Sequence, residues 1–222
     1  MKAKSLIPIL AEIWGVDQDR ADKIDRSLAD GGMRAKGKGR AVPEMTRLEA
    51  IHFLIGCMVT RVPSRAADEA LPWIEADGLL PVMPVAAPDV DEWDDESDLS
   101  ERLKIYNATQ PFFEKMAYPA KSSKLIKLTD YLLILCRLFE SPRFNPDGII
   151  FRISTSHPMA TIEFQDNRGA VIDSLGFFDK TDQSDDMIDP RYAIDQSATV
   201  YGGALLAIAA RTKDPLQMEN QA

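Results

Sequence analysis

The apolar residues of this chain change their spacing at a Pro-Asp-Gly turn, residues 146–148, and this change constrains the fold more than any other feature. Before the turn, apolar residues recur every three or four positions, which is typical of helices. After it, they alternate with polar residues over 149–155, 159–165 and 170–178, which is typical of half-buried strands. The spacing therefore predicts a mainly α (α+β) protein with a small three-stranded antiparallel β-meander in its C-terminal half.

Helix start and stop signals support this prediction. Serine, threonine or aspartate residues precede apolar runs, where their side chains can accept hydrogen bonds from the first free N–H groups of a helix. Gly15 stands where the first helix has to stop. The main predicted helices are 5–14, 18–30 after the cap Asp17, 46–59 after the cap Thr46, a buried central helix over 123–140, and a last helix capped by Ser197.

Charge is distributed unequally along the chain. The formal net charge is −9, but residues 1–65 hold 12 Lys and Arg against 8 Asp and Glu, whereas residues 66–222 hold 14 against 27. Such asymmetry suggests a basic binding module attached to an acidic body. We therefore predict a basic module over 1–76, a Pro/Asp-rich acidic linker over 77–98 and an acidic α+β domain over 99–222.

The basic module has the features of a helix-turn-helix or winged-helix-like DNA-binding unit. If Ala21, Ile24 and Leu28 face inward, the second helix presents cations and a hydroxyl at one-turn spacing, as a helix in the major groove requires. The loop MRAKGKGR then places a cation at every second position, so an extended loop projects them toward a phosphate chain. The candidate DNA-binding residues are Lys23 and Arg26 on the solvent face, Arg20 and Ser27 on its flank, and Arg34, Lys36, Lys38 and Arg40 in the loop.

A solvated helical hairpin is the alternative interpretation of the same segment. The acids Asp19, Asp22, Asp25 and Asp30 share the second helix with these cations, and carboxylates repel phosphate. The sequence GKGR is also compatible with an ordinary surface loop. Spacing alone leaves both interpretations open.

The stretch from Leu6 to Val59 resembles the N-terminal helix-turn-helix module of uncharacterised, phage-associated or gene-transfer-agent-type regulators of alphaproteobacteria. The resemblance covers roughly a quarter of the chain and implies a DNA-binding transcriptional regulator or phage-type accessory protein whose basic turn acts as a wing. This chain departs from the family pattern in the acids of its second helix, which bears on base readout more than on phosphate contact. The residues that carry the resemblance are Gly15-Val16, Arg26, Leu28, Gly32 and the segment from Gly37 to Thr46, with the apolar helix after it.

A second hypothesis rests on the acidic tract between residues 89 and 101, which surrounds an aromatic residue. An aromatic side chain among carboxylates can anchor in an apolar pocket while the charges steer a basic partner. The chain would then be a non-catalytic protein-interaction or inhibitor protein, its partner a basic surface such as a transcription or nucleoid component. The tract could instead be a solvated linker, or fold back over the basic module. The candidate partner-binding residues are Asp91, Glu92, Trp93, Asp94 and Asp95.

No enzyme class is indicated by the sequence. His52 and His157 are the only histidines, and neither stands in an HExxH, P-loop or GxSxG pattern. We therefore predict no catalytic residues, no metal and no cofactor. Cys57 and Cys136 lie in apolar runs and are expected as small buried hydrophobes. No apolar run is long enough to cross a membrane, so the expectation is a cytoplasmic protein with no membrane partner, and a homodimer is an open possibility.

Overall fold

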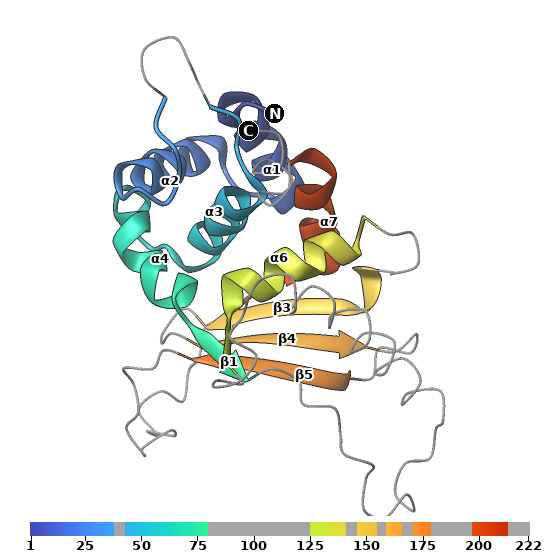
Figure 1. Cartoon of the computed structure of the whole chain (residues 1–222). Helices are drawn as coiled ribbons and strands as arrows, with labels where there is room; N and C mark the ends of the chain where they lie inside the picture. The colour runs from blue at the N-terminus through green and yellow to red at the C-terminus, as the bar shows by residue number, and fades with distance from the viewer. Residues whose placement is uncertain are drawn as a thin grey trace, which may run out of the picture.

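The computed structural model describes residues 1–37, 43–79, 125–140, 146–154, 159–165, 171–178 and 197–212. Within these ranges, six α-helices and a six-stranded sheet form a mixed α+β fold. Figure 1 shows the helices gathered on one face of the sheet. The predicted α+β class is therefore confirmed, although the sheet is twice as wide as the predicted meander.

The first helix ends, and the second helix begins, at the expected residues. α1 (Ala3–Trp14) stops at Gly15, whose φ of 67° lies in the left-handed region that glycine adopts without strain. α2 (Gln18–Asp30) begins after Asp17, whose side chain accepts a hydrogen bond from the Arg20 N–H at 3.0 Å. The predicted cap at Asp17 is thus confirmed, and it sets the tight turn between the two helices.

α3 (Arg47–Val59) is the central helix of the N-terminal part. Thr46 and Glu49 form a reciprocal capping box at its start, which confirms the predicted cap at Thr46. Most of the helix is apolar and buried, including Phe53 and Leu54. The remaining helical elements are η1 (Pro63–Arg65), α4 (Ala66–Ile74), α6 (Leu128–Leu138), η3 (Pro146–Gly148) and α7 (Gly202–Arg211).

Every neighbouring pair of strands in the sheet is antiparallel, in the order β2-β1-β5-β4-β3-β6. The central strands β3, β4 and β5 occupy the segments predicted for the meander. The predicted three-stranded sheet is nevertheless wrong, because β2 and β1 extend the sheet beyond β5 and β6 extends it beyond β3. The strands are β1 (Asp77–Leu79), β2 (Leu125–Lys127), β3 (Ile149–Ser154), β4 (Met159–Gln165), β5 (Val171–Phe178) and β6 (Ser197–Tyr201).

The prediction that Ser197 caps the last helix is wrong. Ser197–Tyr201 is a strand that pairs with β3. Its Ala198 and Val200 pack on the core while Tyr201 is 63% exposed, which is the alternation of a strand rather than the stripe of a helix. The helix starts at Gly202, where an added Cβ would lie 2.1 Å from the Pro146 carbonyl oxygen.

The single helix predicted over 123–140 is also wrong at its start. Residues Leu125–Lys127 form β2, which pairs with β1, and α6 begins only at Leu128. β1 itself occupies the first three residues of the predicted linker over 77–98, so these residues belong to the fold. Short paired strands of this kind carry no periodicity of their own and are defined by their partners.

One hydrophobic core joins the N-terminal helices to the sheet. α3 contacts α6, α7, β3 and β6, and α1 contacts α7. A single cluster of buried side chains runs from Ala3 to Ala209 and includes residues on both sides of the predicted boundary at residue 76. The described parts of the predicted basic module and of the predicted acidic domain therefore share a core.

Arg47 is the largest fully buried side chain and lies where these parts meet. It is 1% exposed, at the first position of α3. Its Nη2 donates to the Glu140 carboxylate after α6 and, at 3.3 Å each, to the carbonyl oxygens of Ala209 and Thr212 at the end of α7. The last carbonyls of a helix lack intrahelical partners and carry partial negative charge, so a buried cation is stabilised there.

We expect Arg47→Ala to lower the free energy of unfolding by about 3 kcal/mol, because it leaves a cavity and removes the hydrogen bonds to three groups. Urea unfolding followed by circular dichroism measures the change. Since the core is shared, the expected result is one cooperative transition at a lower urea concentration.

The matched control is Arg65→Ala, which removes an exposed cation from η1. Its expected effect is within about 0.5 kcal/mol. Equal effects of the two substitutions, or a transition in which only the helical signal of one part is lost, would contradict the role assigned to Arg47.

Candidate nucleic-acid interface

The outer face of α2 presents two of the predicted DNA-binding cations to solvent. Ala21, Ile24 and Leu28 are buried, as their spacing predicts. Lys23 and Arg26 lie on the opposite side and are exposed. Their accessibility agrees with the prediction, and their contact with DNA stays a prediction.

The two flanking residues of α2 serve the fold instead. The Arg20 guanidinium donates to the Thr60 carbonyl oxygen. Ser27 is 8% exposed, and its hydroxyl donates to the Ser64 carbonyl at 3.2 Å while accepting from the Ala67 N–H at 3.1 Å. The expectation that Ser27 flanks the solvent face is therefore wrong, because the segment after α3 covers it and uses its hydroxyl.

Arg34 is likewise held inside the module. Its Nε and Nη2 lie 2.6 and 2.9 Å from the two carboxylate oxygens of Asp25 in α2, and the two side chains are 12% and 16% exposed. Burial raises the pKa of Asp25, and the neighbouring guanidinium opposes this rise. The prediction that Arg34 and Lys36 project to one side with Lys38 and Arg40 is not met at Arg34, which fastens the loop to α2.

Glu49 joins both ends of the basic loop. Its Oε1 accepts from the Ala35 N–H and its Oε2 accepts from the Thr46 N–H, each at 2.6 Å. We call residues 35–46 the basic arm. The His52 ring Nδ1 lies 3.0 Å from the Met33 carbonyl oxygen and adds a second tie between α3 and the segment leading into the arm.

Three lysines lie around the ends of the arm. Lys36 is exposed, with its Nζ 2.8 Å from Asp30, and this contact lowers the pKa of the Asp30 carboxyl. At the other end, Lys2 forms an isolated antiparallel bridge with Glu44, and the Met45 N–H donates to the Met1 carbonyl at 3.0 Å. Lys2 and the nearby Lys4 of α1 are exposed beside the arm.

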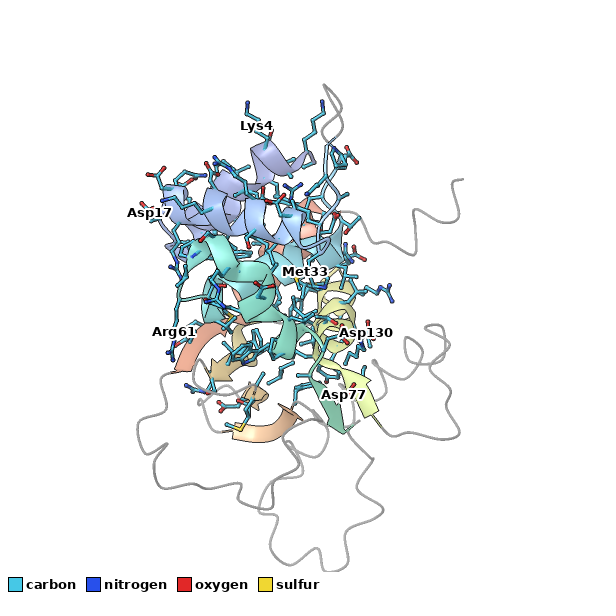
Figure 2. All side chains as sticks on the ribbon, turned by 90° about the vertical axis from the view of Figure 1, so that its left-hand side faces the viewer. Lys4, Asp17, Met33, Arg61, Asp77 and Asp130 are labelled. Atoms are coloured by element: carbon cyan, nitrogen blue, oxygen red, sulfur yellow. The ribbon has the colours of Figure 1, made fainter. Side chains whose placement is uncertain are left out.

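Figure 2 shows Lys4 at the end of the molecule opposite Asp77 in β1. The start of α1, and the end of the arm at Glu44 that pairs with Lys2, thus lie at the end away from the sheet. Sequence reasoning missed Lys2 and Lys4. The bridge between residues 2 and 44 has no local sequence signal that could have revealed their place.

The remaining candidates fall outside the described residues. These are Lys38 and Arg40 of the arm, and Asp91, Glu92, Trp93, Asp94 and Asp95 of the acidic tract. Among the residues that the structure describes, no group of His, Cys, Asp and Glu side chains is arranged to hold a metal ion. None of the helices in those ranges is long and apolar enough to cross a membrane.

No family model matches this chain, and neither a curated protein nor a solved structure is significantly similar to it. The family resemblance of the segment from Leu6 to Val59 therefore stays a prediction. The function has to be inferred from the geometry described above.

The burial of His52 predicts a pH-dependent stability. Burial lowers the pKa of His52 in the folded state, against smaller opposing effects of the Met33 carbonyl and of Glu49. Below the ordinary pKa of about 6.5, the unfolded chain therefore binds a proton at His52 that the folded chain resists. The free energy of unfolding thus decreases as the pH is lowered. We expect His52→Gln to reduce the loss of stability between pH 7.5 and pH 5.5.

Urea unfolding at the two pH values measures this effect. His157→Gln is the matched control, because it changes the other of the two histidines in the chain. If the two substitutions reduce the pH dependence equally, or if neither does, the effect does not come from the burial of His52.

Proposed function

We propose that this chain binds duplex DNA through a basic surface around the arm, as a transcriptional regulator or a phage-type accessory protein. The observation that carries the proposal is the double hydrogen bond of Glu49 to the Ala35 and Thr46 N–H groups. This carboxylate fixes both ends of a segment rich in cations and glycine. In the proposal, α1, α2 and the basic arm correspond to a helix-turn-helix-like module and its wing.

The charge around the arm supports this choice of surface. The chain between the two anchors carries Lys36, Lys38 and Arg40, and Lys2 and Lys4 lie beside its second end. Five cations, in the arm and at the start of the chain, can each neutralise a phosphate and release a counterion, and this release supplies most of the free energy of DNA binding that does not depend on sequence.

The outer face of α2 is the second part of the proposed surface. Arg26 and Lys23 lie one and two turns before Asp30, the residue that contacts Lys36. The two exposed cations therefore continue from the near end of the arm along α2. They bring the number of proposed phosphate contacts from five to seven.

The test is fluorescence anisotropy of the full chain with a random-sequence duplex, titrated across salt concentrations. Five to seven neutralised phosphates give a slope of log K against log salt between about −4.5 and −6. We expect Lys2→Ala with Lys4→Ala to weaken binding and to make this slope shallower by about 1.8, because two counterions are no longer released.

The matched control removes two cations from the sheet: Lys127→Ala in β2 with Arg152→Ala in β3. Each of these two side chains is 43% exposed. The control therefore changes the net charge by the same amount as the Lys2 and Lys4 double variant, but at the opposite end of the molecule. The control should leave the slope unchanged. Equal changes of slope in both double variants would show that the arm surface is not the contact. Absence of binding at low salt, both by the full chain and by the chain lacking residues 89–98, would reject the proposal.

The acidic protein-interaction hypothesis is the second candidate, and one observation favours it. Arg20, Ser27 and Arg34 are used inside the fold, as expected if the N-terminal part is scaffold. Deleting residues 89–98 separates the hypotheses. If the full chain fails to bind DNA but the shortened chain binds it, the acidic tract masks the basic surface; if neither binds, the protein-partner hypothesis stands.

A further inference from the structure

A helix that reads base sequence needs side chains with hydrogen-bonding groups that are not already used within the protein. In α2 several of these groups are used. Ser27 and Arg20 bond to backbone carbonyls after α3, and the Gln18 amide donates to Asp22 at 3.0 Å within the helix. The hydroxyl and one guanidinium of this helix are therefore committed to the fold, whereas Arg26 keeps an exposed guanidinium.

The exposed cations that remain on α2 alternate with acids. Asp19 lies one turn before Lys23, and Asp22 lies one turn before Arg26, so each cation has a carboxylate neighbour on the same side. A helix that enters the major groove has phosphates on both sides. Inserting α2 would bring Asp19 and Asp22 toward those phosphates, which costs electrostatic energy.

The described cations at the ends of the arm are suited to phosphates rather than to bases. Lys2, Lys4 and Lys36 are the exposed cations placed there by the described residues. A lysine ammonium is a compact point charge without the planar pair of donors with which arginine recognises guanine. Arg34, the arginine leading into the arm, is held by both oxygens of Asp25.

From these three observations we infer that the chain contacts duplex DNA through its phosphate backbone and does not select a base sequence. The inference rests on the proposed DNA-binding function and narrows it. A protein of this kind coats or bridges DNA, or delivers other activities to it, rather than locating an operator. Its ligand class is the phosphate backbone of a duplex of any sequence.

The first test compares the affinity of the full chain for several unrelated duplexes of equal length at one salt concentration, followed by selection from a random library. The expected affinities agree within about threefold, and the selected pool has no shared motif. For comparison, one mismatched base pair in a specific site costs about 1–3 kcal/mol, or roughly 5- to 150-fold.

Arg26→Lys provides the second test. It keeps the charge of the exposed arginine in α2 but removes its ability to recognise guanine with two hydrogen bonds. We expect the affinity to stay within about twofold of the parent chain and the salt slope to stay the same, whereas Arg26→Ala should make the slope shallower by about 0.9.

The outcomes separate the inference from the function on which it rests. An enriched motif, or a loss of more than tenfold in affinity for one duplex in Arg26→Lys but not for others, overturns sequence independence while DNA binding stands. If no duplex is bound at low salt, either by the full chain or by the chain lacking residues 89–98, both the inference and the proposed function are rejected.

Discussion

The guanidinium of Arg47 bonds to residues from two other parts of the chain, and the arrangement of the helices over the sheet depends on it. A cation that is 1% exposed is costly unless it is paired and hydrogen-bonded. Here Glu140 supplies the charge, and the end of α7 supplies carbonyl groups that its own helix leaves unbonded. The start of α3 is therefore fixed against both α6 and α7, and the apolar cluster forms around this contact.

The basic arm depends on a second carboxylate that performs two tasks. Glu49 completes the capping box of α3, and the same side chain accepts from the Ala35 N–H at the other end of the arm. Glu49 thereby attaches the arm to α3, the helix of the N-terminal part that has the most buried residues. This arrangement gives a glycine-rich segment with repeated cations two fixed ends, and the second end lies beside Lys2 at the start of the chain.

Local signals were sufficient for some elements of this fold but not for others. The caps at Asp17 and Thr46 act within three residues, and the alternation in β3 to β5 is long enough to identify the strands. The segment Ser197–Tyr201 runs directly into a small-residue helix, so local spacing predicts it as the start of that helix. β1 and β2, of three residues each, are strands because they pair with each other and with β5. Ser27 and Arg34 were misplaced because their partners, Ser64 and Asp25, lie in other elements.

The position of Arg47 also bears on how the chain acquires its structure during synthesis. Its three acceptors lie 93 to 165 residues further along the chain. When α3 leaves the ribosome, the helix that closes the core over it has not yet been made. The N-terminal helices must therefore wait, with apolar surface exposed, until α7 is synthesised. Long-range closure of this kind is slow and leaves a nascent chain with exposed apolar surface prone to aggregation.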